Sequence, residues 1–289
     1  IVAQHSFGIP CDILPIVEFA KKKSIFLLED CALSVGSKIN NITVGNFGNA
    51  SLFSTDRSKP INSIIGGLIY SNDSSLISSL KETQNSIPEL ERKKQKALFD
   101  YLKFEKKYLR DNIIKFQILL KIRLSFLKRY DPFLSEDFSS IPSHTYPYPS
   151  KLPVFLAQLG LYELERWKEN KKIRKSFLAN FIKLAKQNKF INLLPDSYFD
   201  NSLDIIPHRI VWTQDNGEAV RNKLSALFDV SWIWFLKPLA ATNEPLYLFG
   251  YKDKSCPIAE SSCEGMVNIP NPINKNYHSF LESVFKILG

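Results

Sequence analysis

Several features that mark particular protein classes are missing from this 289-residue sequence. No apolar run reaches about 18 residues, the length that predicts a transmembrane helix. The first residues, IVAQHSFGIP, contain neither a basic segment nor a small-residue cleavage site, so they do not indicate a signal peptide. An initiator methionine is missing too, and the sequence opens in an apolar, strand-like run, as expected of a chain cut from something longer.

Cysteine and histidine are also scarce. The four cysteines lie far apart and form no C-x-x-C pair, which argues against a zinc site and predicts reduced thiols in a cytoplasmic protein. None of the four histidines lies in a pattern typical of a catalytic triad or a metal site. We therefore expect no metal, and we expect structural or surface roles for the histidines.

Positive charge is concentrated in one stretch of the chain. Residues 81–129 hold 14 Lys or Arg and 6 Asp or Glu, so they carry +8 of the net charge of +9. Such local basicity is weak support for nucleic-acid binding, and we expect no nucleic-acid partner. Residues 112–130 mix apolar and basic residues. They predict a core-facing helix with a solvated basic side, and the alternative is contact with an anionic membrane surface.

The pattern of residues 1–75 predicts a mostly parallel sheet with helices. Residues 13–23 have apolar side chains at helical spacing, whereas residues 24–28, 44–53 and 67–70 form short strand-like runs. Ligands bind at the carboxyl ends of strands in such sheets, and Asp30 directly follows the run SIFLL. On local grounds a turn or helix cap explains Asp30 equally well.

The rest of the chain predicts a helical middle and a second domain. Helical patterns run from residue 76 to about 130, and residues 131–150 are rich in Pro and Ser, as in a linker. After Lys151 we expect a long amphipathic helix, then strands at 204–212 and 230–235 around a helix at 217–228, and a closing helix at 277–288. The predicted parts are the remainder of a large domain, a basic helical insertion with linker, and a small α+β domain, at 1–75, 76–150 and 151–289.

One lysine lies in an unusual setting. The segment FSTDRSKPINSIIGG, residues 53–67, is too rich in Ser, Pro and Gly for a helix, and it surrounds Lys59 with hydroxyls, a guanidinium and a Gly pair. A lysine that binds an aldehyde cofactor such as pyridoxal phosphate (PLP) needs an acid at the pyridine nitrogen and donors for the phosphate. Asp30 and the hydroxyls near Lys59 are candidates, although spacing alone leaves an ordinary loop lysine open.

Longer motifs carry a family resemblance. The stretches EDCALSVGS, VGNFGNASLFSTDRSK and Gly66-Gly67 resemble the DegT/DnrJ/StrS family of sugar aminotransferases, whose pattern is E-D-x-A-Q, G-x-x-G-x-x-x-x-F-S, a Lys five residues after that Ser, and a Gly pair. Further stretches match in order: QHSFGIPCDI, LAQLGLYELERW, PLAATNEPLY and CPIAESSCEGMVNIP. The resemblance implies an α/β fold comprising the C-terminal part of a PLP fold type I large domain and a smaller α+β domain.

The resemblance also implies roles for individual residues. Lys59 would be the Schiff-base lysine and the general base, Asp30 would bind the pyridine nitrogen, and Ser54 would bind the phosphate. The implied reaction transfers an amino group, usually from glutamate, to a nucleotide-linked keto-sugar in amino-sugar or surface-polysaccharide biosynthesis. A cytoplasmic homodimer would carry it out.

Some positions depart from the family pattern and keep alternatives open. The Gln after E-D-x-A is Leu33, the aromatic after F-S is Thr55, and the Asn that would reach the partner subunit's phosphate is Pro149. Family members also carry a segment before the position that matches residue 1. These departures favour a non-catalytic relative that keeps the fold and dimer surface, while the basic stretch alone suggests a docking protein. Lys59 speaks against the family's dehydratases, which have His there.

Overall fold

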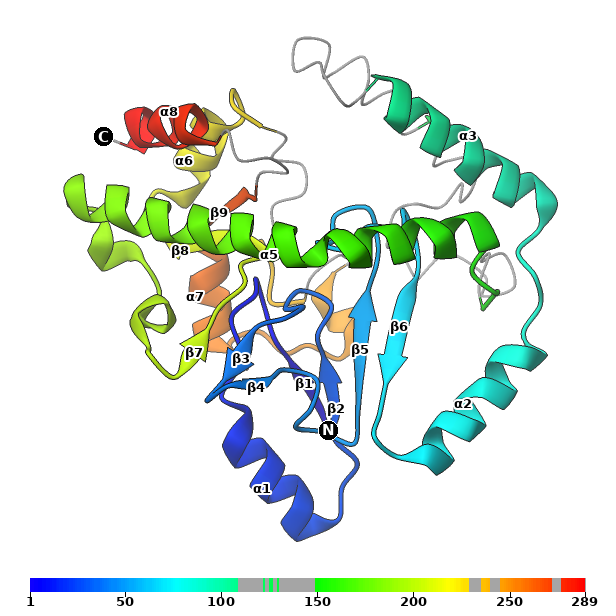
Figure 1. Cartoon of the computed structure of the whole chain (residues 1–289). Helices are drawn as coiled ribbons and strands as arrows, with labels where there is room; N and C mark the ends of the chain where they lie inside the picture. The colour runs from blue at the N-terminus through cyan, green and yellow to red at the C-terminus, as the bar shows by residue number, and fades with distance from the viewer. Residues whose placement is uncertain are drawn as a thin grey trace. The chain divides into compact units, whose positions relative to one another are not determined.

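The computed structural model describes residues 1–108, 122, 125, 126, 129, 149–228, 235–239, 245–271 and 277–288 (Figure 1). The chain divides into two compact units. Unit 1 comprises 1–77, 161–240 and 253–289, and unit 2 comprises 78–160 and 241–252. The three-part division expected from the sequence stays a prediction. The predicted linker up to residue 148 and nearly all of the basic helix at 112–130 lie outside the described residues.

A four-stranded sheet forms the N-terminal part of unit 1 (Figure 1). Its order is β1-β2-β5-β6, with bounds Val2–Gln4, Leu28–Asp30, Ala50–Ser54 and Gly67–Tyr70. The β1/β2 and β2/β5 pairs are parallel and the β5/β6 pair is antiparallel, which confirms the mostly parallel sheet. A parallel pair needs a crossover connection, and helix α1, Ile13–Lys23, provides it between β1 and β2.

The bounds of α1 agree with the apolar spacing in the sequence. Ile13 and Ala20 are buried, and they pack in one cluster with Ala3 of β1 and with Leu27 and Ile39. A left-handed Ser24 ends the helix, and its amide hydrogen bonds back to the last turn. The apolar stripe of α1 therefore covers the sheet and fixes the position of β2, the strand that ends in Asp30.

A small second sheet joins segments far apart in the chain. Strands β3, β4 and β7, at Lys38–Ile39, Ile42–Thr43 and Leu203–Asp204, pair antiparallel in the order β4-β3-β7. Nearby, the Ile206 amide donates to Ser37 Oγ at 2.9 Å, and Ser37 Oγ donates to the Gly8 carbonyl at 2.6 Å. These bonds attach the loop after β1 to the segment that leads into β8.

The C-terminal part of unit 1 is an α+β arrangement around an aromatic core. Strands β8 and β9, at Arg209–Thr213 and Met266–Pro270, pair antiparallel. The helical elements are α5, α6, α7, α8, η2 and η3, at Val154–Gln187, Gly217–Leu224, Pro257–Gly265, His278–Leu288, Ile191–Leu193 and Asp196–Phe199. The first residues of α5, up to Gly160, belong to unit 2. Buried Phe181 packs against Trp212 with tilted rings, and buried Phe177 meets Tyr277 edge-on, which holds α5 to β8 and to the segment before α8.

The sequence prediction for this α+β region was right for most elements and incomplete for one. The long helix, the first strand, the following helix and the closing helix are confirmed with shifted ends. The strand expected at 230–235 lies outside the described residues except for Phe235. The partner of β8 is β9, which the prediction missed. MVNIP is only five residues long and follows α7 directly, so it has no turn signal before it.

Unit 2 is mainly helical where it is described. Helices α2 and α3, at Ser74–Ser86 and Arg92–Tyr108, flank Pro88, as expected of a residue that cannot continue a helix. The first four residues of α2 belong to unit 1. Buried Leu98, Tyr101 and Leu156 form part of the unit's interior, and η4 spans Leu246–Phe249. No helix in the described part of the chain is both long and apolar enough to cross a membrane.

Gly8 makes a close backbone contact that no other residue type fits. Its φ is +91°, and a Cβ there would lie 2.2 Å from the Ile206 carbonyl oxygen and 2.7 Å from Pro207 Cα. Gly8→Ala is therefore expected to lower the free energy of unfolding by about 2–4 kcal/mol, from backbone strain and collision together. Urea denaturation measures this.

Gly250 offers a matched control for Gly8. Its φ is +75°, but no atom of the described residues lies within 4 Å of the position of an added Cβ. Gly250→Ala should cost about 1 kcal/mol, from the backbone conformation alone. Equal losses in the two variants would contradict the close contact at Gly8.

Candidate active site

The structure places two of the predicted site residues at the same edge of the sheet. Asp30 ends β2 and Ser54 ends β5, and these strands are parallel neighbours in which Asp30 is paired with Leu52. The carboxyl ends of parallel strands are where such sheets bind ligands. Lys59 follows in the loop that joins β5 to β6, residues 55–66. The motif residues Asp30 and Ser54 thus lie at the ends of neighbouring strands, and Lys59 follows Ser54.

Within the part of the chain that the structure describes, one carboxylate oxygen of Asp30 accepts a hydrogen bond and the other accepts none. Its Oδ1 accepts the Ala32 amide hydrogen at 3.0 Å, which orients the carboxyl group. Among the described residues, no hydrogen-bond donor reaches Oδ2. Asp30 is half-buried, so an N–H group of a ligand can approach this second oxygen.

The loop that carries Lys59 is held together from within. The Thr55 amide donates to the Gly66 carbonyl at 2.9 Å, and the Arg57 amide donates to the Ile64 carbonyl at 3.0 Å. Ser63 Oγ lies 2.6 Å from Thr55 Oγ1 and 2.8 Å from the Ile65 carbonyl. The Lys59 amide closes a turn on the Asp56 carbonyl at 2.8 Å. This bonding gives the Lys59 backbone a defined conformation although the segment is neither helix nor strand.

Ser54 lies where this loop begins. Its Oγ accepts the Asp56 amide hydrogen at 3.4 Å, and within the described ranges no acceptor takes the hydroxyl hydrogen. A hydroxyl can accept one hydrogen bond and donate another. Ser54 can therefore donate to a ligand anion at the end of β5.

Helix α5 contacts the Lys59 loop through a residue that the sequence analysis did not single out. Asn170 Nδ2 donates to the Pro60 carbonyl at 3.0 Å, directly after Lys59. Arg174 Nε in turn donates to Asn170 Oδ1 at 2.9 Å. The only sequence signal for the Asn170–Arg174 pair was its spacing of four residues on one helix. Such pairs are common on helices, so the spacing did not single it out.

Positive side chains surround a buried histidine near the loop. His208 is 3% exposed, and burial lowers its pKa well below the usual value, as do the charges of Lys59, Arg174 and Arg209. His208 is therefore neutral at physiological pH. Burial lowers the pKa of Arg174 to about 10, which still leaves its guanidinium protonated. The gathering of these cations favours a negatively charged ligand in this part of unit 1.

Glu29, the neighbour of Asp30, is the centre of a buried hydrogen-bond network. It is fully buried, and its Oε1 accepts the amide hydrogens of Phe47 and Gly48 at 2.6 Å each. Its Oε2 accepts the Gly45 amide hydrogen at 2.6 Å and lies 3.2 Å from Nε2 of buried His5. Glu29 therefore pairs with His5 and binds the loop before β5, and His5 has the structural role expected of the histidines.

The same network explains the state of Glu29 and the tautomer of His5. Burial alone would raise the pKa of Glu29, but the hydrogen bonds from His5, Gly48, Gly45 and Phe47 outweigh it and lower the pKa below its usual value. His5 Nδ1 accepts the Cys11 amide hydrogen at 3.1 Å, so the ring proton lies on Nε2 and faces Glu29. Glu29 is thus an ionised, satisfied anchor for the loop before β5.

Cys31 completes a group of possible metal-binding atoms with His5 and Glu29, all within 4.8 Å of one another. Both oxygens of Glu29 already accept hydrogen bonds, and a structural zinc site uses four protein ligands. We therefore assign this group a structural role. Cys31 and the other three cysteines are free thiols, as predicted.

Two positions that depart from the family pattern lie in the protein interior. Leu33 is 4% exposed, and Thr55 is 6% exposed with its hydroxyl bonded to Ser63. Pro149, the third, is exposed. Leu33 and Thr55 thus contribute packing and loop bonding where the family pattern has a polar amide and an aromatic ring.

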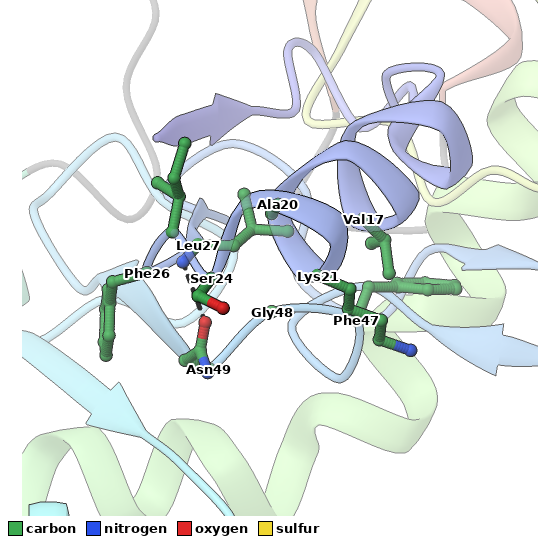
Figure 2. A pocket seen from close by; sticks show the side chains of 10 residues that line it. Val17, Ala20, Lys21, Ser24, Phe26, Leu27, Phe47, Gly48 and Asn49 are labelled. Carbon is green, nitrogen blue, oxygen red and sulfur yellow. Dashed lines mark hydrogen bonds between the residues drawn. The ribbon is translucent and has the colours of Figure 1, made fainter.

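A separate pocket of about 460 Å³ lies near the opposite ends of the same strands (Figure 2). Figure 2 shows it between α1 and the segments that precede β2 and β5, lined by Val17, Lys21, Phe26, Phe47 and Asn49 among others. Asn49 Oδ1 accepts the Leu27 amide hydrogen at 2.8 Å. Among the described residues, one charged side chain lines this pocket, so it lacks the convergent polar groups of a catalytic site.

Solved structures define the class of fold. A DegT DnrJ EryC1 StrS aminotransferase from Brucella abortus superposes with a TM-score of 0.66 at 16% sequence identity, covering 100% of this chain and 63% of that chain. The GDP-4-keto-6-deoxy-D-mannose-3-dehydratase of E. coli, solved with bound hydrated PLP, also gives 0.66 at 17% identity, covering 100% of this chain and 67% of that one. The fold expected from the motifs, that of the PLP-dependent aminotransferases, is thereby confirmed.

Sequence comparisons match the N-terminal part of the chain to one family. Residues 1–101 match the model of the DegT/DnrJ/EryC1/StrS aminotransferase family. GDP-perosamine synthase of Escherichia coli O157:H7 is 43% identical over 76 residues, which are 26% of this chain and 21% of that relative. The chain thus matches only about a fifth of the length of this curated relative.

Proposed function

We propose that this chain is part of a PLP-dependent aminotransferase that acts on a nucleotide-linked keto-sugar and takes its amino group from an amino acid, usually glutamate. The observation that carries the proposal is the placement of Asp30 and Ser54 at adjacent ends of parallel strands, with Lys59 in the braced loop that follows. This placement lies within the segment that matches the aminotransferase family. The names of GDP-perosamine synthase and of the PLP-containing dehydratase support a nucleotide-sugar substrate and PLP.

The described residues fit PLP at three points. When bound, PLP supplies an electron sink that stabilises negative charge on the substrate carbon. Asp30 Oδ2 would accept the pyridine N–H and keep that nitrogen protonated, and the Ser54 hydroxyl would donate to the phosphate. Lys59 would attach the cofactor and then move a proton between the cofactor carbon and the substrate carbon.

The remaining parts of the proposal concern the setting of the reaction. We propose a cytoplasmic homodimer that works in amino-sugar or surface-polysaccharide biosynthesis, without a nucleic-acid partner. The names of the relatives support the biosynthetic role. The alternative is a relative that keeps the fold and dimer surface without catalysis, which the buried apolar Leu33 favours.

A spectroscopic titration of the full-length protein tests the proposal. We expect PLP to develop a visible absorption band, glutamate to bleach it, and a GDP-linked keto-sugar to restore it. The reason is that the cofactor gains the amino group in the first half of the transfer and gives it up in the second. A band that glutamate leaves unchanged would favour the non-catalytic relative. If no band forms at any PLP concentration, the protein is not a PLP enzyme.

A further inference from the structure

Helix α5 holds the Lys59 loop through a side-chain hydrogen bond. Asn170 Nδ2 lies 3.0 Å from the Pro60 carbonyl oxygen, and 110 residues of sequence separate the two partners. Most of the bonds described for this loop run within it, whereas this bond attaches it to another element of unit 1. Pro60 and Ile61 are buried, so the bond lies at the inner side of the loop.

The bond acts close to Lys59 because of the residue it reaches. The proline ring fixes φ of Pro60, and the peptide between Lys59 and Pro60 is planar. Between the Lys59 Cα and the Pro60 carbonyl, only the ψ angles of the two residues remain soft. A carbonyl held by Asn170 therefore restricts where the Lys59 Cα, and the side chain that it carries, can lie.

Asn170 is itself oriented by Arg174. The Arg174 Nε donates to Asn170 Oδ1 at 2.9 Å, which leaves the amide NH₂ group of Asn170 facing Pro60. Arg174 is 8% exposed, and its Nη1 donates to the Pro207 carbonyl at 3.0 Å and to the His208 carbonyl at 3.3 Å. A buried guanidinium bonded on several sides cannot reorient cheaply. It links Asn170 to the segment that leads into β8.

We propose that Asn170 is a positioning residue for Lys59, and that Arg174 holds Asn170 in the orientation that this requires. The proposal rests on the role of Lys59 in the proposed function. Asn170 does not touch the reacting atoms. It acts by keeping the Lys59 backbone at a fixed place relative to the ends of β2 and β5.

Two substitutions separate the hydrogen bond from the packing of Asn170. Asn170→Ala removes both the donor and the acceptor. Asn170→Asp keeps the acceptor for Arg174, removes the donor to Pro60 and adds a negative charge beside the Arg174 guanidinium. Asn180→Ala is the matched control, because Asn180 lies on the same helix and its Nδ2 donates to Tyr277 Oη at 2.9 Å, away from the Lys59 loop.

The first measurement needs no cofactor. The full-length protein is treated briefly with an amine-acetylating reagent, and mass spectrometry gives the labelling rate of Lys59 relative to exposed Lys22. The second measurement is the rate at which PLP develops its visible band. We expect both Asn170 variants to change the relative labelling of Lys59 several-fold and to slow PLP capture by about tenfold. Asn180→Ala should match the wild type in both.

The outcomes separate this proposal from the proposed function. Wild-type labelling and PLP capture in both Asn170 variants would overturn the positioning role. An equal change in Asn180→Ala would also overturn it, because the effect would then come from the helix as a whole. If wild-type protein forms no visible band, the PLP proposal fails, while the labelling of Lys59 still decides whether Asn170 positions it.

Discussion

Lys59→Ala is expected to abolish the visible band that PLP forms with the full-length protein, and to lower amino transfer by at least about 10²–10⁴-fold. The lysine amine is the group that would attach the cofactor and carry the proton, and alanine can do neither. General acid–base catalysis alone contributes a factor of this size. Absorbance titration with PLP and an assay of glutamate-dependent amino transfer measure the two effects.

A stability measurement accompanies this variant. Lys59 is half-buried in a loop whose described bonds run mainly between backbone atoms and the side chains of Ser63 and Asn62. Urea denaturation of the variant separates loss of the PLP band from loss of folding. Lys22→Ala, on the exposed last turn of α1, is the control and should leave both readouts at wild-type values. A Lys59→Ala protein that kept the visible band would remove Lys59 from the proposed role.

Glu29→Ala should lower the free energy of unfolding by about 3–5 kcal/mol. It removes one partner of a buried pair, and it leaves the amides of buried Gly45 and of half-buried Phe47 and Gly48 without their acceptor. Urea denaturation of wild type and variant measures the loss. Glu18→Gln, on the exposed side of α1, is the control and should stay within about 0.5 kcal/mol of the wild type.

The stability that Glu29 contributes should also depend on pH. Folding lowers the pKa of Glu29 below its usual 4.5, so the folded state binds fewer protons than the unfolded state in acid. The contribution is complete above the usual value and is lost as the pH falls through the folded pKa. The difference in unfolding free energy between wild type and Glu29→Gln should thus shrink below about pH 4.5, by at most about 1.4 kcal/mol per pH unit. A difference that grew in acid would contradict the ionised anchor.

Local sequence patterns predict much of the fold. The apolar spacing of residues 13–23 predicts α1 at its observed bounds, and the run GLIY predicts β6, because the periods of helix and strand are set by backbone geometry. Local patterns did not predict strand β9, because a segment forms a strand only when it pairs with another strand. MVNIP becomes a strand by pairing with Arg209–Thr213, more than fifty residues earlier.

The candidate site likewise has features that the sequence predicts and features that only the structure shows. The sequence by itself determined the residue types and their order: Asp30 after a short strand, Ser54 and Lys59 in one motif, and the family to which they point. Only the tertiary structure decided that β2 and β5 are parallel neighbours, that Glu29 anchors the loop before β5, and that Asn170 reaches Pro60 across 110 residues. The physical reason is that motif residues are set by local spacing, whereas a buried hydrogen bond forms between whichever distant groups the packed core brings together.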